Sequence, residues 1–298
     1  MNLPLQYVPP LFRPPSEAAS LIFQVTIGCS WNRCAFCEMY RVKQYAQRPL
    51  DDILREIRSC GILCAQNNAR LRKIFLADGD ALALPTDTLL AILRQIGQSF
   101  PHQPRVSSYA LPRNINKKST SELGALRAAG LSLVYLGIES GCDEVLRLVQ
   151  KGETAKSTIT ALQKAKVCGI KSSVMILNGL GGIGLSEKHA VESALVLNET
   201  QPEYASTLVL YFPMGPERLR SSFPDFSLPG QHALFREMEI LLENLQLDST
   251  IFRSDHASNY LILKGVLNKD RDKLLEQVRT AIHSPEKTNL QNEWMRGL

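Results

Sequence analysis

The sequence predicts an α/β fold built on parallel strands, and two observations support this fold class. Short apolar segments rich in β-branched residues recur along residues 20–213, and each is followed by a segment with helical periodicity. Six strands that alternate with helices imply a parallel sheet with right-handed crossovers. Either a doubly wound sheet or a barrel-like (β/α) array fits this order. In both architectures the functional side chains gather at the C-terminal ends of the strands.

The strands are indicated by short apolar runs that end at glycine or polar residues. Ahead of them, five prolines among the first 15 residues predict an extended arm over residues 1–19, because proline disfavours the interior of a helix. The first strand is apolar on both faces, which is typical of a buried parallel strand, and Gly28 ends it. We expect the six strands at residues 21–27, 73–77, 105–110, 133–138, 171–177 and 206–212.

The helices are indicated by apolar residues at a spacing of about 3.6 residues. Thr86 or Asp87 begins the second helix, and Ser119 or Thr120 can cap the third, with Glu122 in its first turn. We expect the intervening helices at residues 51–65, 86–96, 119–129, 154–167 and 186–197.

The pattern changes beyond Pro213, where the strand–helix alternation stops. A helix at 231–245, an irregular or strand-like segment at 249–264 and a helix at 269–283 follow a stretch rich in proline and glycine. We interpret residues 214–298 as a short, α-rich C-terminal extension, or lid, that packs on the sheet domain of residues 20–213.

Composition excludes several classes of protein. Hydrophobic residues make up 44% of the 298 residues and charged residues 21%, which excludes a disordered or fibrous chain. Subtracting 29 acidic from 34 basic residues leaves a net charge of +5, too little by itself to indicate nucleic acid binding. Without a charged start typical of a signal peptide, or an apolar stretch near the roughly 20 residues that cross a membrane, we expect a cytoplasmic protein with no membrane partner.

The strongest motif is the loop Gly28-Cys29-Ser30-Trp31-Asn32-Arg33-Cys34-Ala35-Phe36-Cys37, directly after the first strand. Its three thiolates, within nine residues, can ligate three irons of a cubane cluster. A closed structural zinc site requires four protein ligands, so three cysteines either need a distant fourth ligand or leave one position for another group. A zinc knuckle completed by a distant His or Cys, and a set of plain core cysteines, are the alternatives.

The loop, its place after the first strand and the aromatic Phe36 before its last cysteine resemble the radical S-adenosylmethionine superfamily. The resemblance implies that Cys29, Cys34 and Cys37 hold a [4Fe-4S] cluster whose fourth iron is chelated by S-adenosylmethionine. It also implies reductive cleavage of that cofactor to methionine and a 5′-deoxyadenosyl radical, which abstracts a hydrogen atom. The implied fold is a partial (β/α)6 TIM-like barrel. Most members have three residues between the first two cysteines, whereas this chain has four.

Further segments at strand ends continue the resemblance. Asp78, Gly79 and Asp80 follow the second strand, where the family has a Gly-Gly-Glu segment that receives the methionine amino group of the cofactor. The ordinary alternative is a helix-capping turn. Glu139 and Lys151 resemble residues of methylthiotransferase-like and coproporphyrinogen-dehydrogenase-like members that contact the ribose and the methionine carboxylate.

The residue types themselves bear on the assignments of Glu139 and Lys151. A glutamate that ends a buried strand is costly without partners, which favours a site at Glu139. A lysine in a loop is more often solvated, and Arg147 competes with Lys151 for its role.

Four more residues are expected at the cofactor. Asn178 and Gly179, after the fifth strand, resemble the glycine-containing segment beside the adenine. The same run lacks the Lys-Ser/Thr that a phosphate-binding loop requires. Ser108 closes the third strand and is either a contact to cofactor or substrate or a polar strand end. Phe36, in the cysteine loop, completes the expected cofactor-binding set.

The segment 252–260 is dense in hydrogen-bonding side chains, namely Arg253, Asp255, His256, Asn259 and Tyr260. Our hypothesis is that it binds substrate, with His256 as a proton carrier. The alternative is a buried, hydrogen-bonded loop. The four other cysteines are interpreted as structural: Cys60, Cys64, Cys142 and Cys168.

The resemblance implies an external electron donor such as ferredoxin or flavodoxin. A small-molecule or tetrapyrrole-like substrate is favoured over nucleic acid, because no basic stripe interleaved with aromatic residues is visible. The accessory domains of methylthiotransferases do not fit in 298 residues. A tRNA-modifying enzyme of the same superfamily and a non-catalytic zinc- or iron–sulfur-binding module are the alternatives.

Overall fold

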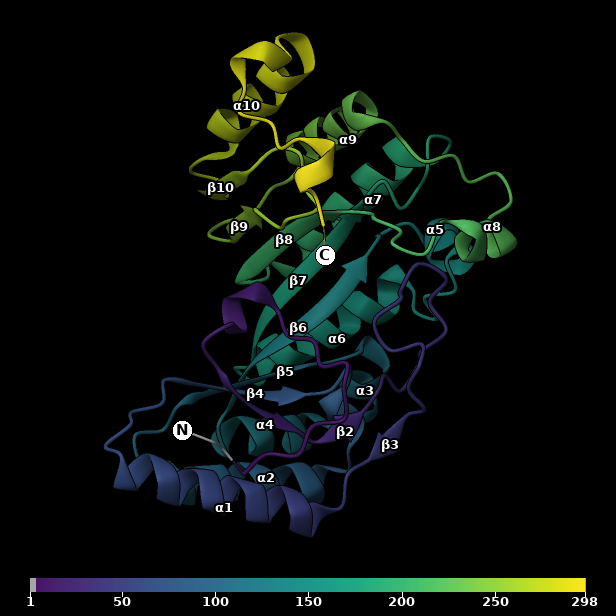
Figure 1. Cartoon of the computed structure of the whole chain (residues 1–298). Helices are drawn as coiled ribbons and strands as arrows, with labels where there is room; N and C mark the ends of the chain where they lie inside the picture. The colour runs from purple at the N-terminus through teal and green to yellow at the C-terminus, as the bar shows by residue number, and fades with distance from the viewer. Residues whose placement is uncertain (1–3, 298) are drawn as a thin grey trace. The chain divides into compact units, whose positions relative to one another are not determined.

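The chain folds into two units, each built on parallel strands (Figure 1). The structure is a computed structural model that describes residues 4–297. The first unit contains the chain up to Asn32, Cys37–Leu136 and Gln163–Ser172. The second contains Arg33–Phe36, Gly137–Leu162 and the chain from Ser173 onward. The predicted α/β class with parallel strands is therefore confirmed.

In the first unit the strand order is β1-β4-β5-β6, and all neighbouring pairs are parallel. These strands are β1 (Leu21–Gln24), β4 (Lys73–Ala77), β5 (Arg105–Tyr109) and β6 (Leu131–Glu139). Their helices are α1 (Leu50–Gln66), α2 (Thr86–Ser99), α3 (Pro112–Lys117) and α4 (Thr120–Ala128), with short 3-10 turns η1 (Pro15–Glu17) and η2 (Ala81–Ala83). Helix α2 packs against both α1 and α4. Fully buried Phe23, Phe75, Ile57 and Leu89 form part of the core on which the strand ends are positioned.

The strand predicted over 21–27 is interrupted at Val25. Its second part, β2 (Thr26–Ile27), leaves β1 and pairs antiparallel with β3 (Ala46–Gln47). The interruption follows from a change of backbone partner, because the Val25 carbonyl accepts from the Arg48 amide at 3.2 Å. The two strands of this small sheet flank the segment that contains the cysteine loop.

In the second unit the strand order is β7-β8-β9-β10. The strands are β7 (Lys171–Asn178), β8 (Tyr204–Val209), β9 (Ile251–Ser254) and β10 (Leu263–Val266). The remaining helices are α5 (Asp143–Leu148), α6 (Ala155–Val167), α7 (Ser186–Thr200), α8 (Glu217–Ser222), α9 (Gln231–Asn244), α10 (Arg271–His283), η3 (Pro285–Lys287) and η4 (Glu293–Met295). Helix α9 packs against both α7 and α10 (Figure 1).

The C-terminal segment contributes strands as well as helices. Strand β9 pairs in parallel with β8, and β10 pairs antiparallel with β9. Residues beyond 213 therefore extend the sheet of the second unit, in addition to packing on it. Strand β8 also begins and ends earlier than the predicted 206–212, since the Val209 amide donates to the Asn259 side chain at 2.8 Å.

The predicted extended arm is irregular over 4–14 and is fixed to β1, and residues 1–3 of that prediction lie outside the described residues. The Val8 amide donates to the Gln24 side chain at 2.8 Å, and the Tyr7 hydroxyl donates to the Ile22 carbonyl at 2.8 Å. No helix in the described part of the chain is long and apolar enough to span a membrane.

We predict that Ser119→Ala lowers the free energy of unfolding by about 1 kcal/mol, the typical contribution of a helix N-cap. Ser119 Oγ accepts from the Glu122 amide at 3.1 Å, and the Glu122 carboxylate accepts from the Ser119 amide at 2.7 Å. Urea denaturation measures the change. Ser121→Ala, at an exposed position of the same helix, is the matched control, and equal effects of the two variants would contradict the prediction.

Candidate functional site

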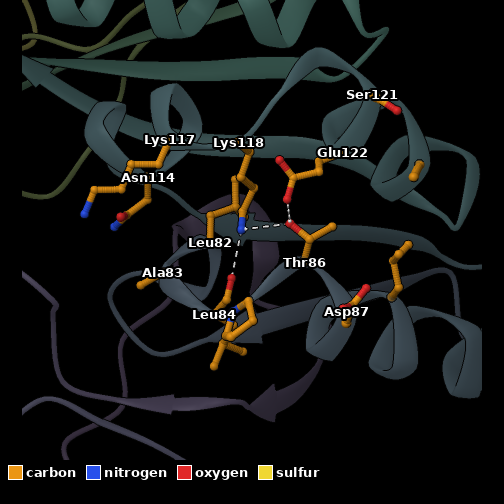
Figure 2. Close-up of a pocket in the computed structure, with 13 residues that line it drawn as sticks. Leu82, Ala83, Leu84, Thr86, Asp87, Asn114, Lys117, Lys118, Ser121 and Glu122 are labelled. Carbon is orange, nitrogen blue, oxygen red and sulfur yellow. Dashed lines mark hydrogen bonds between the residues drawn. The ribbon is translucent and has the colours of Figure 1, made fainter.

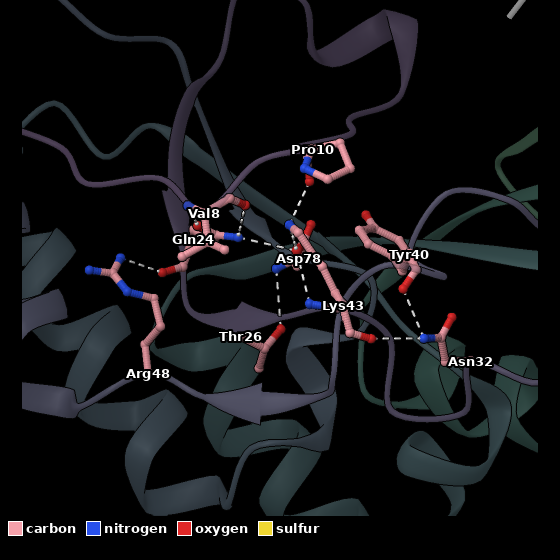
Figure 3. A network of polar contacts seen from close by, with 10 residues as sticks. Val8, Pro10, Gln24, Thr26, Asn32, Tyr40, Lys43, Arg48 and Asp78 are labelled. Atoms are coloured by element: carbon pink, nitrogen blue, oxygen red, sulfur yellow. Dashed lines mark hydrogen bonds and ion pairs between the residues drawn. The ribbon is translucent and has the colours of Figure 1, made fainter.

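A buried ion pair lies where β4 ends in the first unit (Figure 3). Lys43 Nζ lies 2.6 Å from Asp78 Oδ2, and the two side chains are 3% and 0% exposed. The same oxygen accepts from the Gln24 side chain at 3.1 Å and from the Gly28 amide at 3.0 Å. Lys43 Nζ also donates to the Pro10 carbonyl at 2.5 Å. Asp78 therefore connects the N-terminal arm, β1 and the start of the cysteine loop.

Asp80 holds the cysteine loop to the segment after β5. Its Oδ2 accepts from Ser30 Oγ at 2.5 Å and from the Asn114 side chain, and its Oδ1 accepts from the Leu111 amide at 3.3 Å. Burial raises the pKa of Asp80 to about 6, although these donors favour the ionised form. Because both oxygens of Asp80 are engaged, the residue fixes the conformation of the loop around Cys29.

Gly79 allows the cysteine loop to approach the end of β4. A Cβ atom at this position would lie 2.7 Å from the Tyr40 ring and 3.1 Å from the Cys29 Cβ. The Gly79 amide donates to the Gly28 carbonyl at 3.1 Å. The Tyr40 hydroxyl is buried near Asp78, and burial, together with the charge of that carboxylate, raises its pKa. The Asp78–Asp80 segment therefore packs against the first cysteine of the loop.

The three loop cysteines are partly exposed and form no disulfide. Cys29 and Cys37 belong to the first unit, and Cys34 belongs to the second. Among residues 4–297, no group of three His, Cys, Asp or Glu side chains is gathered as a metal site. In the second unit, the Ala35 amide donates to the Val149 carbonyl at 2.8 Å, and Phe36 packs against a buried cluster that contains Cys142, Leu180 and Phe226.

The interpretation of Cys60 and Cys64 as structural agrees with their burial on α1. Burial raises the pKa of the Cys60 thiol to about 12, and it raises the pKa of Cys64 as well. A thiol with a raised pKa is a poor metal ligand, because the thiolate is the ligating form.

In the first unit, a cavity of about 560 Å³ opens beside Asp80 and its hydrogen-bond partners (Figure 2). Asn114 lines it and also donates to Asp80. Lys118 Nζ donates to the Leu84 carbonyl at 2.8 Å, and Thr86 Oγ1 donates to the Glu122 carboxylate at 2.6 Å. Burial lowers the pKa of Lys118. The polar groups of this wall bond to one another, and no sequence motif predicts a cavity here.

Ser108 lies on β5 and is fully buried. Its hydroxyl donates to the carbonyl of Tyr109 at 3.0 Å. The Tyr109 ring in turn packs edge-on against Phe75, with ring centres 5.1 Å apart. This bond agrees with a polar strand end, and the cofactor contact of Ser108 stays a prediction.

In the second unit, Glu139 and Lys151 form an ion pair, although the sequence suggested only a separate cofactor contact for each. Lys151 Nζ lies 3.0 Å from Glu139 Oε1, and the two side chains are 6% and 8% exposed. Glu139 has a backbone φ of +66°. A Cβ atom at Gly137 would lie 2.0 Å from the Glu139 carboxylate, so only glycine leaves room for this pair. The two residues that the resemblance singled out from separate segments are therefore in contact.

The turn after β7 contains Asn178 and Gly179. Gly179 has a φ of +87°, and its amide donates to Glu237 Oε1 at 2.6 Å. Glu237 lies on α9 and was not predicted as a site residue. A signal was present, because Leu234, Glu237 and Leu241 are spaced three and four residues apart, which places a glutamate on the apolar face of this helix.

The segment 252–260 is held mainly by contacts within the second unit. The Asn259 side chain donates to the Thr207 carbonyl at 2.8 Å, which fixes the segment to β8. His256 Nδ1 lies 2.9 Å from Ser258 Oγ, and burial lowers the pKa of this histidine. The Tyr260 ring is covered by the Arg296 guanidinium, 3.7 Å from the ring centre. These contacts match the hydrogen-bonded loop that was the alternative to a substrate-binding role.

Comparison with known proteins assigns the chain to a family. The model of the radical SAM superfamily matches residues 23–196, which is more than half of the chain. The chain belongs to the radical SAM superfamily. As a member, it has a [4Fe-4S] cluster and S-adenosylmethionine as its cofactors.

Individual relatives agree with this assignment. The heme chaperone HemW of Bacillus subtilis is 22% identical over 180 residues, which are 59% of this chain and 47% of HemW. A methylthiotransferase-like protein of Methanocaldococcus jannaschii is 25% identical over 183 residues, which are 57% of this chain and 38% of that protein. This radical SAM chain thus spans at most about half the length of either relative.

The fold is similar to that of a solved radical SAM enzyme, the coproporphyrinogen III oxidase HemN from Escherichia coli. The TM-score is 0.56 at 17% identity, and the match covers 75% of this chain and 52% of HemN. This similarity confirms the radical SAM fold.

Several buried oxygen atoms of the predicted site residues lack a hydrogen-bond donor, and S-adenosylmethionine has the donors that they need. In the described part of the chain, the buried oxygens without a hydrogen-bond partner include Asp78 Oδ1, Glu139 Oε2 and Asn178 Oδ1. A buried acceptor without a donor costs about 1–3 kcal/mol, so a ligand that supplies N–H or O–H groups would stabilise each of them. The ammonium, hydroxyl and amino groups of this cofactor are such donors.

We predict that Lys43→Met lowers the free energy of unfolding by about 3–5 kcal/mol, because it leaves the Asp78 carboxylate buried without its cation. The double variant Lys43→Met/Asp78→Asn should recover part of that loss. Urea denaturation of wild type, Lys43→Met, Asp78→Asn and the double variant measures both effects.

Lys188→Met provides the control, because it removes an ion pair with Glu144 whose side chains are 48% and 43% exposed. Its urea midpoint should stay at the wild-type value. A Lys43→Met variant as stable as this control would contradict the prediction.

Proposed function

We propose that this chain is a radical SAM enzyme in which Cys29, Cys34 and Cys37 hold the [4Fe-4S] cluster. When bound, the cluster and S-adenosylmethionine supply a 5′-deoxyadenosyl radical by reductive cleavage. The chain then directs the abstraction of a hydrogen atom from its substrate. The observation that carries this proposal is the set of three unpartnered buried oxygens at the ends of β4, β6 and β7.

Each of these oxygens has a proposed role. Asp78 Oδ1 accepts from the methionine ammonium, while its other oxygen stays bonded to Lys43. Glu139 Oε2 accepts from a ribose hydroxyl, while Oε1 stays bonded to Lys151. Asn178 Oδ1 accepts from the amino group of the adenine. In each carboxylate one oxygen fixes the side chain, and the other is left to bind the cofactor.

The remaining predicted residues have supporting roles in this proposal. Lys151 attracts the methionine carboxylate in addition to holding Glu139. Gly79 lets the backbone after β4 approach Cys29, and Asp80 keeps Ser30 in place. Phe36 is held by the apolar cluster of the second unit and borders the cofactor.

We propose a small-molecule substrate, with tetrapyrroles as the favoured class, and ferredoxin or flavodoxin as the electron donor. The names of two similar proteins, a heme chaperone and a coproporphyrinogen III oxidase, support the tetrapyrrole class. Addition of coproporphyrinogen III or heme should then increase the rate of 5′-deoxyadenosine formation above the rate without substrate. An unchanged rate with both compounds would exclude them as substrates.

We predict that the anaerobically reconstituted protein forms 5′-deoxyadenosine and methionine from S-adenosylmethionine when dithionite supplies electrons. Cys34→Ala should abolish both the iron–sulfur absorption and this cleavage. Cys168→Ala is the matched control and should retain both, because that thiol bonds to the Thr120 carbonyl at 3.4 Å, outside the cysteine loop. Stoichiometric zinc without iron–sulfur absorption or cleavage would overturn the proposal in favour of a zinc-binding module.

We also propose that His256 contacts the substrate and acts as a proton carrier. His256→Ala should leave dithionite-driven cleavage without substrate within about twofold of wild type, since its partner Ser258 belongs to the same turn. Loss of cleavage, with the cluster absorption intact, would show instead that His256 acts on the cofactor.

A further inference from the structure

The glycine turn after β7 is enclosed by residues of the C-terminal segment. The Ile183 amide donates to the Ser227 carbonyl at 3.0 Å. A Cβ atom at Gly179 would lie 3.0 Å from Leu234 and 3.2 Å from Pro229, so the backbone of the turn packs directly on these side chains. The turn that we propose for adenine binding therefore depends on residues far beyond it in the sequence.

Glu237 makes the polar contact within this packing. Its side chain is 2% exposed, and its two oxygens accept from different segments of the second unit. Oε1 accepts from the Gly179 amide at 2.6 Å. Oε2 accepts at 2.5 Å from the hydroxyl of Ser186, which is the first residue of α7. One side chain of α9 thus fixes both the beginning of the turn and the helix that follows it.

A second contact extends from Glu237 toward the end of β6. His189 Nε2 lies 3.7 Å from Glu237 Oε1, and His189 Nδ1 lies 2.8 Å from Ser140 Oγ. Ser140 directly follows Glu139, and the adjacent Gly141 amide donates to Ser193 on α7 at 2.9 Å. Burial lowers the pKa of His189 to about 4, so this ring is neutral at pH 7. The two strand ends of the second unit are connected through these buried groups.

Burying a glutamate side chain to hold a turn costs free energy. Removing a carboxylate from water costs several kcal/mol, and an apolar residue of similar size would often be at least as stable. Burial accordingly raises the pKa of Glu237 to about 7, against the two donors that favour the ionised form. What an apolar residue cannot supply is an acceptor that sets the direction of the Gly179 amide and the position of Ser186.

We infer that Glu237 is a positioning residue for S-adenosylmethionine, and that α9 is therefore part of the cofactor site. It acts by holding the Asn178–Gly182 turn in the shape that presents Asn178 Oδ1 and the glycine backbone to the adenine. This role rests on the proposed function, in which Asn178 and Gly179 contact the cofactor.

The experiment compares Glu237→Met with Glu239→Met, a matched control two residues along the same helix. Glu239 is also buried, but its partners are Arg236 at 2.6 Å and Arg279 at 2.8 Å. Amide hydrogen exchange of the protein without cofactor should accelerate by about tenfold or more over residues 178–183 in Glu237→Met, because the Gly179 amide loses its acceptor. Glu239→Met should leave exchange in this segment unchanged.

The second measurement is the dissociation constant for S-adenosylmethionine of the reconstituted proteins, with the iron content of each determined alongside. Glu237→Met should weaken binding by about tenfold at unchanged iron content, because the turn and α7 lose both of their hydrogen bonds to this side chain. Glu237→Gln should restore binding to within about threefold of wild type, since its amide oxygen still accepts from Gly179. Glu239→Met should bind as wild type does.

The outcomes separate the two proposals. If wild type binds and cleaves the cofactor but Glu237→Met binds it equally well, the inference about Glu237 is overturned and the proposed function stands. If Glu237→Met does not fold, Ser186→Ala, which removes one of the two donors, should weaken binding by about threefold, and no weakening would also overturn the inference. If wild type neither binds nor cleaves S-adenosylmethionine, the proposed function fails, and this role of Glu237 fails with it.

Discussion

The ion pair between Lys43 and Asp78 is the interaction on which the first unit depends. It lies at the end of a central strand, it is inaccessible to solvent, and its carboxylate also holds Gln24 and the Gly28 amide. Through these donors the N-terminal arm, β1 and the base of the cysteine loop are fixed to one another. A buried pair of this kind is seldom the most stable solution, but it imposes a single arrangement on the segments that it joins.

The two units share one arrangement of buried carboxylates. Asp78 directly follows β4 and Glu139 is the last residue of β6. Each binds a buried lysine through one oxygen while the other oxygen has no partner. The lysine keeps the side chain oriented and balances its charge, so that the second oxygen does not need a partner for the protein to fold. Such half-bonded carboxylates suit a ligand with several hydrogen-bond donors, because the binding atoms are already oriented.

Much of the fold could be predicted because its signals are local. The strand at 73–77 and the capping box at Ser119 occur where the sequence predicts them, since apolar runs and capping residues act over a few positions. Helices α3, α5 and α8 were missed because six residues are too few to show a helical period. The polar residues that follow the strands could be recognised for the same reason. Lys43 could not, because its role depends on a partner 35 residues away. For Glu237 the sequence shows only a glutamate on an apolar helix face, and its partner lies 58 residues away.

The separation between Gly179 and Glu237 also has a consequence for synthesis. The chain emerges from the ribosome in sequence order, so the cysteine loop and the glycine turn are made before α9. Until the 58 residues that separate Gly179 from Glu237 have been added, the turn lacks the acceptor for its first amide. A nascent chain can therefore fold its first unit while the second is still open. Competence to bind the cofactor would be acquired only after α9 has been made.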